Sequence, residues 1–319
     1  MRSLLLALLL GALAAAAGAQ TSIQVYPLPP RITAHDVWAD PLPDGPVWFS
    51  GQSSGNAGRL DPKTGKVELI PLGPGAAPHG VIVDHDGSAW FTDGGQNAIV
   101  RVDAKTLSLK KWPLPKDSGY ANLNTATFDR AGIHWFTGQN GIYGRLDPKT
   151  GDLRVFDAPR GRGPYGIQST PDGTVYFASL AGSYVGRIDA ATYKVQVLEP
   201  PTRDQGARRV WSDSKGMLWV AEWNSGNLSR YDPKSGAWKS WKAPGERPRV
   251  YAVYVDETDR PWVSEWDKQL MLRFDPATEK WDSFASPSGT ANVRQIHGRR
   301  GEVWTPESAS GKLVVYRYR

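Results

Sequence analysis

Short apolar runs separated by turn residues recur along the whole chain. An aromatic residue stands near the start of one such run every 41 to 45 residues, at Trp48, Trp90, Trp135, Tyr176, Trp219, Trp262 and Trp304. A Gly/Asn/Ser-rich turn follows each aromatic, and the next run ends in Arg-x-Asp, as at 58–61, 144–147 and 186–189. Short runs bounded by turn signals predict β-strands. A fixed period of this length predicts a repeat architecture.

Each repeat holds four such runs, which is the content of one β-propeller blade. The seven aromatic positions therefore predict an all-β fold, a seven-bladed β-propeller. The seventh repeat stops at 318–319 after its third strand, whereas residues 23–29 form a strand with no partner in the first repeat. We expect this N-terminal strand to close the last blade, because closure removes exposed sheet edges. Residues 20–319 then form a single domain, with the tryptophans packed between blades.

Composition excludes several classes of protein. The 319 residues include no Cys, which rules out disulfides, thiolate metal sites and cysteine nucleophiles. The 34 Gly and 25 Pro fit a chain rich in turns. The net charge is +6, but Lys and Arg are interleaved with Asp and Glu. Without a basic block or a nucleic-acid-binding motif, we expect no nucleic-acid partner.

The first nineteen residues are typical of a secretory signal peptide. Arg2 precedes the apolar run 4–10, and an alanine-rich stretch ends in Ala17-Gly18-Ala19. Residues 1–19 therefore predict an exported protein, periplasmic or secreted, that is cleaved before Gln20. The apolar run is too short to predict a membrane anchor. We expect a monomer.

Propeller topology assigns certain residues to one mouth of the central channel. In each blade the innermost strand starts at the face where the second strand ends, so these two ends are expected opposite each other. The predicted pairs are His35 with Gly51, His79 with Asp93, Asn124 with Gly138, Tyr165 with Ser179, Arg208 with Glu222, Tyr251 with Glu265, and Val293 with Glu307.

Acids and histidines are unevenly distributed over this mouth. Blades six, seven, one and two are neighbours in the closed ring, and they would direct Glu265, Glu307, His35, His79 and Asp93 to one side. Imidazoles and carboxylates that converge suit a divalent metal or acid–base catalysis. His79 with Asp93 also fits an orienting hydrogen bond in a channel wall.

The remaining mouth residues suit ligand contacts or packing. Arg208 with Glu222 is most simply a cross-strand ion pair. Trp223 and Trp266 could stack a flat or cyclic ligand or pack against the next blade. With Asn124, Tyr165 and Tyr251, these residues form the predicted substrate-binding set.

The repeated sequence motif is most complete in blade two. It runs from Pro78-His79-Gly80 through Asp84-x-Asp86-Gly87 and Trp90-Phe91-Thr92-Asp93 to Asp103. It resembles the virginiamycin B lyase family, also called streptogramin B lyases, over essentially the whole chain after residue 19. The resemblance implies magnesium-dependent opening of the ester of a cyclic depsipeptide by elimination, and so implies Mg²⁺ as cofactor. It implies a histidine base, a glutamate two residues before that base, an acid fourteen residues after it and a second histidine from the preceding blade.

The family places this set on its last two blades. Here those blades carry Tyr251, Val293 and Ala291 at the corresponding positions, and only Glu307 matches. The pattern recurs on blades one and two, where the resemblance makes His79 the base and His35 the second histidine. As a hypothesis that goes beyond the family pattern, we expect Asp93, Glu307 and Glu265 to hold the metal.

Two further functions stay open. One is an exported propeller that binds a small ligand, a cyclic peptide or a protein at this mouth without catalysis. The other, a metal-dependent lactonase of the six-bladed kind, is disfavoured by the count of seven aromatic positions.

Overall fold

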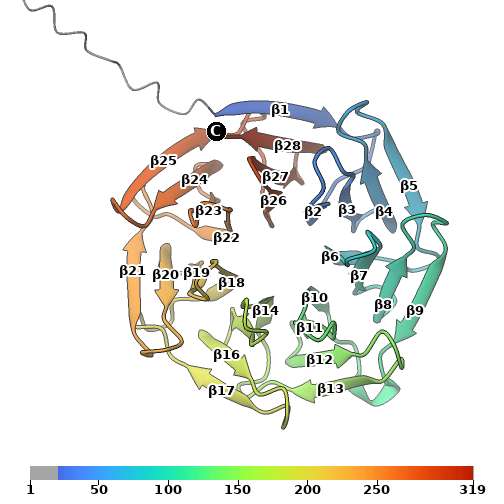
Figure 1. The fold of residues 1–319 in the computed structure, drawn as a ribbon, viewed down its shortest axis with the longest axis horizontal. Helices are drawn as coiled ribbons and strands as arrows, with labels where there is room; N and C mark the ends of the chain where they lie inside the picture. The colour runs from blue at the N-terminus through green and yellow to red at the C-terminus, as the bar shows by residue number, and fades with distance from the viewer. Residues whose placement is uncertain (1–20, 319) are drawn as a thin grey trace, which may run out of the picture.

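The computed structural model describes residues 21–318. The predicted signal peptide, residues 1–19, lies outside the described residues. Within them, seven four-stranded antiparallel sheets are arranged as blades around a central channel (Figure 1). Seven sheets confirm the propeller predicted from the spacing of the aromatic residues.

The strands of blades one to four begin at the channel and proceed outward. Blade one holds β2 (Val37–Ala39), β3 (Val47–Gly51), β4 (Asn56–Leu60) and β5 (Val67–Pro71). Blade two holds β6 (Pro78–Val83), β7 (Ala89–Asp93), β8 (Ala98–Val102) and β9 (Leu109–Pro113). Blade three holds β10 (Leu123–Phe128), β11 (His134–Gly138), β12 (Ile142–Leu146) and β13 (Leu153–Asp157), and the short 3-10 turn η1 (Lys116–Ser118) precedes it. Blade four holds β14 (Pro164–Ser169), β15 (Val175–Ser179), β16 (Tyr184–Ile188) and β17 (Val195–Leu198).

The remaining blades repeat this order, and the last one uses both ends of the chain. Blade five holds β18 (Ala207–Ser212), β19 (Leu218–Glu222), β20 (Asn227–Tyr231) and β21 (Trp238–Lys242). Blade six holds β22 (Val250–Val255), β23 (Pro261–Glu265), β24 (Leu270–Asp275) and β25 (Lys280–Ala285). Blade seven holds β26 (His297–Arg299), β27 (Glu302–Glu307), β28 (Lys312–Arg317) and β1 (Ser22–Pro27).

The N-terminal strand closes the ring as predicted. β1 pairs antiparallel with β28, from Ser22 opposite Arg317 to Pro27 opposite Lys312. Tyr26 of β1 stacks on Trp304 of β27 with ring centroids 5.4 Å apart, so the closure also contributes to the core. Figure 1 shows β1 as the outermost strand beside β28.

The repeated tryptophans pack between blades, and turn aspartates fix their orientation. Trp48 of blade one lies in one buried cluster with Val81 and Phe91 of blade two. In four blades the indole Nε1 donates to an aspartate six residues earlier, in the turn between the two inner strands; the pairs are Trp90–Asp84, Trp135–Asp129, Trp219–Asp213 and Trp262–Asp256.

In five blades the observed register differs from the predicted one, because a β-bulge lies at the start of the innermost strand. Pro78, rather than His79, is opposite Asp93, and the pairing shifts before Gly80. The same shift occurs in blades three to six, whereas Val293 does pair with Glu307. A bulge places two residues opposite one and changes the direction of the extra side chain. The residues just before His79, Arg208 and Tyr251 therefore pair with the acids that were predicted to face these three side chains.

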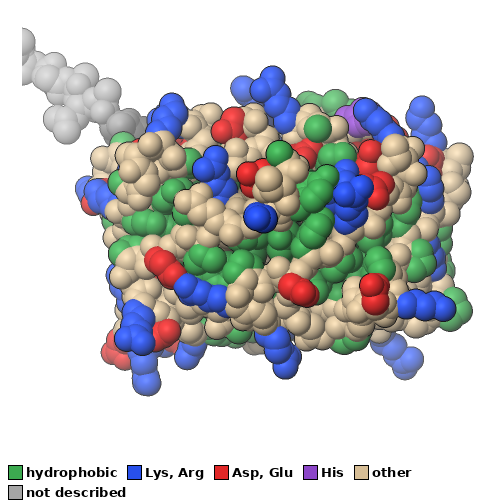
Figure 2. Space-filling view, turned by 90° about the horizontal axis from the view of Figure 1, so that it is seen from below, with side chains coloured by type: hydrophobic (Ala, Val, Ile, Leu, Met, Phe, Trp, Pro, Cys, Tyr) green, Lys and Arg blue, Asp and Glu red, His purple; other side chains and the backbone are tan. Residues whose placement is uncertain are grey.

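The charged side chains do not form a block of one sign on the side of the molecule shown in Figure 2. Lys and Arg project near both rims, and Asp and Glu lie among them. This mixed surface agrees with the interleaved charges of the sequence. Among the described residues, the structure contains no helix with the length and apolar character needed to cross a membrane.

Candidate functional site

Residues just before or at the start of the innermost strands meet at one mouth of the channel. The rings of His35 and His79 lie 4.0 Å apart between centroids. His79 Nε2 is 3.1 Å from Asn124 Nδ2. The Tyr165 ring meets the His79 ring edge-on with centroids 6.3 Å apart, and its hydroxyl is 2.6 Å from that of Tyr251. The structure thus brings the two predicted catalytic histidines together.

Arg209 connects the two histidines, and sequence reasoning missed it. Its Nη2 lies 3.0 Å from Asp36 Oδ1, and this oxygen is 2.9 Å from His35 Nδ1. Its Nη1 donates to Thr125 Oγ1 at 2.6 Å, and Thr125 donates to Asn124 Oδ1 at 2.7 Å. Asp36 and Arg209 come from blades one and five, so no local pattern indicates that they meet.

This network fixes which ring nitrogens carry protons. A carboxylate only accepts, so His35 Nδ1 is protonated and its Nε2 has a free lone pair. Because Thr125 donates to Asn124 Oδ1, the amide nitrogen of Asn124 donates to His79 Nε2. The lone pair of His79 is therefore already used, and its Nδ1 is buried without a hydrogen-bond partner.

Both imidazoles are neutral at physiological pH. Burial lowers the pKa of His35, Arg209 and Arg294 lower it further, and Asp36 only partly offsets these effects. Burial, with a smaller contribution from His35, lowers the pKa of His79 well below its usual value. Of the two histidines, His35 is therefore the one with an unused ring lone pair, whereas the lone pair of His79, the base suggested by the resemblance, accepts from Asn124.

His35 also borders an open cavity, while His79 is only 4% exposed. The cavity of about 320 Å³ lies between blades one and seven. Beside His35 it is lined by Arg294 and the polar side chains of Gln52, Asn292 and Ser308. A ligand in this cavity would lie beside His35 and Arg294.

The acids predicted to hold a metal instead bind their own loops. Asp93 Oδ1 accepts from the backbone N–H groups of Ala77 and Gln96. Glu265 accepts from the N–H groups of Arg249, Asp267 and Lys268 at 2.7 to 2.9 Å. Glu307 accepts from the hydroxyls of Ser286, Ser288 and Ser310. These carboxylates tie strand ends to loops and do not converge on the histidines.

The predicted Arg208–Glu222 ion pair is absent from the described residues. Glu222 accepts from Ser225 and Ser229, while Arg208 donates to the Tyr165 hydroxyl at 3.1 Å. The Arg208 guanidinium carbon lies 3.4 Å from the centroid of the Tyr251 ring. Burial opposes ionisation of Tyr251, but Arg208 and Arg209 outweigh it and lower the pKa of this phenol.

Trp223 and Trp266 extend this aromatic cluster to the surface. Trp266 stacks on Tyr251 with centroids 5.0 Å apart, and Trp223 meets Trp266 edge-on at 5.8 Å. Arg249 lies over Trp223 and Arg294 over Trp266. Both indoles are half-buried, so they pack together and still present surface to a ligand.

Comparison with known proteins decides the family. The model of the virginiamycin B lyase family matches residues 10–236 of the 319. The chain belongs to this family. A virginiamycin B lyase of Nocardia farcinica (strain IFM 10152) is 28% identical over 212 residues, which are 66% of this chain and 70% of that protein.

Solved structures of virginiamycin B lyases share the fold. A streptogramin B lyase structure superposes with a TM-score of 0.84 and 22% identity, covering 94% of this chain and 98% of that one. The Staphylococcus aureus enzyme gives a TM-score of 0.85 and 20% identity, covering 93% and 99%. A catalytically inactive histidine-to-alanine variant of that enzyme has been solved with quinupristin.

The residues at this mouth do not fit the Mg²⁺ ion that membership of the virginiamycin B lyase family suggests. Mg²⁺ prefers oxygen ligands. Among residues 21–318, the one group of three possible ligands whose donor atoms lie within 4.8 Å of one another is His35, Asp36 and His79. Two of these donors are nitrogens, and the Asp36 carboxylate is already paired with Arg209.

Proposed function

We propose that this member of the family is a carbon–oxygen lyase that opens an ester within a cyclic, peptide-like ligand at the His35 mouth. One observation carries the proposal: His35 borders the open cavity, and its Nδ1 is hydrogen-bonded to Asp36, which leaves Nε2 unprotonated. A positioned imidazole of lowered pKa is suited to remove a proton at neutral pH.

The reaction is an elimination to which no water is added. His35 Nε2 takes a proton from the carbon α to a carbonyl group. The electron pair forms a double bond to the β-carbon, the bond from that carbon to the ester oxygen breaks, and the ring opens with a carboxylate as leaving group. Asp36 stabilises the imidazolium that forms, as an acid partner of a catalytic histidine does.

Arg294 supplies the positive charge that the developing enolate needs. It lines the same cavity as His35, and it lies close enough to lower the pKa of that histidine. Fixed cations aimed at developing negative charge account for much of enzymatic rate enhancement. His79 packs against His35 and positions it.

The test uses the purified chain with quinupristin as the first probe, followed by liquid chromatography and mass spectrometry. Elimination gives a linear product of the same mass as the cyclic ligand, whereas hydrolysis adds one water. We expect the isomeric product with or without a chelator. His35→Ala should lower kcat by about 100-fold or more.

His85→Ala is the matched control, because His85 lies exposed in the turn after β6. It should keep full activity. A product heavier by one water, or full activity of His35→Ala, would refute the assignment. Activity that appears only with added Mg²⁺ would show that the metal is required despite the geometry.

A second candidate function, binding without catalysis, is favoured by the platform of Tyr251, Trp223 and Arg208. Its aromatic rings and guanidinium are already in contact before any ligand arrives. Preformed sites lose little entropy on binding. This function predicts that a cyclic peptide raises the melting temperature without any turnover.

A further inference from the structure

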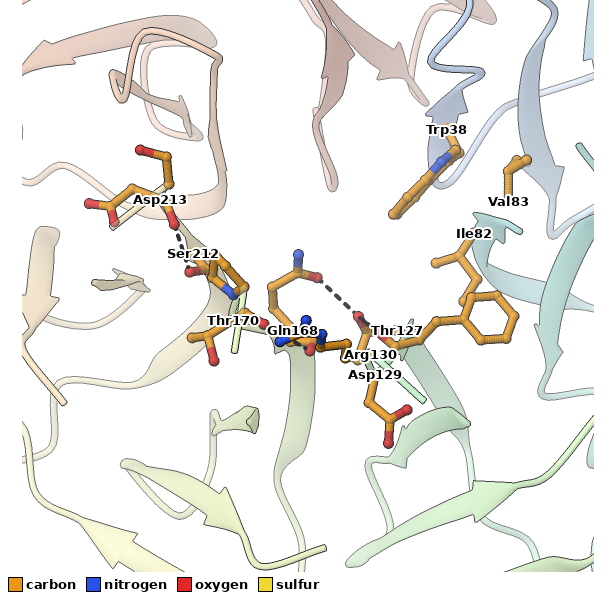
Figure 3. A pocket seen from close by; sticks show the side chains of 14 residues that line it. Trp38, Ile82, Val83, Thr127, Asp129, Arg130, Gln168, Thr170, Ser212 and Asp213 are labelled. Carbon is orange, nitrogen blue, oxygen red and sulfur yellow. Dashed lines mark hydrogen bonds between the residues drawn. The ribbon is translucent and has the colours of Figure 1, made fainter. Parts of the chain in front are cut away.

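A second cavity, of about 530 Å³, lies at the other mouth of the channel (Figure 3). Both mouths share strand β10: Asn124 stands near its start beside His79, and Thr127 and Phe128 end it in this second cavity. Asp36, Arg209 and Trp38 border the space of only about 20 Å³ that remains in the channel between them. The two mouths are therefore separate sites.

One wall of this cavity is apolar and held in place from behind. Trp38 stacks on the buried His297 with ring centroids 3.7 Å apart and an angle of 19° between the planes. His297 Nδ1 accepts the N–H of Ala39, which fixes the ring beneath Trp38. Ile82 and Val83 continue the wall (Figure 3), and Phe128 also lines the cavity. Trp38 is only half-buried, so it presents a rigid aromatic surface to the cavity.

The facing wall carries hydrogen-bonding groups. Thr127 Oγ1 donates to Gln168 Oε1 at 3.3 Å, which leaves the Gln168 Nε2 group without a partner among residues 21–318. Arg130 is exposed and makes no hydrogen bond or ion pair within the same described residues. The hydroxyls of Ser169 and Ser212 donate to backbone carbonyls and can still accept.

The charges in this cavity do not select an anion. The lining holds two acids, Asp129 and Asp213, and a single cation, Arg130. Both carboxylates are held by a Trp Nε1 and by turn N–H groups, so their orientation is fixed. A ligand with hydroxyl groups could donate to these oxygens and accept from Gln168 and Arg130.

We propose that this second cavity binds a neutral sugar of one or two rings. The apolar C–H face of a sugar ring packs on an aromatic surface such as Trp38, and its hydroxyls match the mixed donors and acceptors opposite. The volume lies in the range of small-ligand pockets. This site is independent of the lyase proposed at the His35 mouth.

Isothermal titration calorimetry with glucose, maltose and cellobiose tests this proposal, with phenol as an aromatic ring of similar width that carries a single hydroxyl. We expect saturable binding of at least one sugar and weaker binding of phenol. Trp38→Ala and Gln168→Ala should each weaken the sugar about tenfold or more. Trp223→Ala, at the opposite mouth, should leave sugar binding unchanged. Trp38→Ala should leave ester opening unchanged.

Gln168→Ala serves as the second variant because Gln168 is half-buried and, unlike Trp38, does not pack on the core. Thermal melts establish that each variant is folded. Three results would overturn the proposal: no saturable binding of any sugar, phenol binding as tightly as sugar, or loss of sugar binding in Trp223→Ala alone.

Discussion

Arg209 and Asp36 form an ion pair across the channel, with the guanidinium Nη2 3.0 Å and 3.2 Å from the two carboxylate oxygens. Their side chains are 4% and 1% exposed, and 173 residues separate them in the chain. The pair therefore joins blade five to blade one in a place that excludes water. It also orients His35, so stability and the proposed chemistry depend on the same contact.

Removal of one partner of the Arg209–Asp36 pair should therefore lower both the stability of the fold and the rate of the proposed reaction. Asp36→Asn leaves Arg209 buried without its counterion, and we expect a loss of about 3–5 kcal/mol of unfolding free energy. His35 loses the acceptor that fixes its tautomer, so kcat should fall even at temperatures where the variant is folded. Urea denaturation and the quinupristin assay measure the two effects. Loss of stability with unchanged kcat would show that Asp36 has only a structural role.

The carboxylates that tie strand ends to loops at the mouth give a second prediction. Glu265→Gln replaces one of the oxygens that accept the three backbone N–H groups with an amide nitrogen, which cannot accept. We expect a loss of about 1–3 kcal/mol of unfolding free energy, equal with and without Mg²⁺. Glu246→Gln, on an exposed loop, is the control. If the loss appeared only in the presence of Mg²⁺, Glu265 would be a metal ligand after all.

Buried histidines should make the fold sensitive to acid. Burial lowers the pKa of His134 and of His297 to about 3. The unfolded chain, with a His pKa near 6.5, then binds more protons than the folded one between these values. Above about pH 6.5 the two histidines do not change the free energy of unfolding with pH. As the pH falls from there toward 3, each histidine lowers this free energy by about 1.4 kcal/mol per pH unit.

His134→Phe tests this relation because both ring nitrogens of His134 lack partners and its neighbours are Trp90, Phe128 and Phe136. The free energy of unfolding of this variant, measured by denaturation at pH 7, 6 and 5, should fall less steeply with decreasing pH than that of the parent chain. His85→Ala should follow the parent chain. Equal slopes for His134→Phe and the parent would show that His134 does not titrate on unfolding.

The fold could be predicted from the sequence because each blade repeats the same local signals. Trp90, Asp84 and the turn between them are close in the chain, and their spacing recurs. The site could not be predicted in the same way. A bulge beside Pro78 changes the direction of His79, and the Arg209–Asp36 pair depends on blades that meet only after the ring closes. The adjacent positions of His35 and Asp36 were the one local signal available.

Closure by β1 gives the last prediction. Tyr26 is 5% exposed, stacks on Trp304 and donates from its hydroxyl to the Pro62 carbonyl at 2.9 Å. Tyr26→Ala should therefore cost about 3–5 kcal/mol of unfolding free energy, as for other large core side chains. Val25→Ala, whose side chain faces solvent, should cost much less. Deletion of residues 21–29 would expose the edge of β28, and light scattering should then detect association through that edge. A monomeric, fully stable deletion variant would show that β1 is not needed for closure.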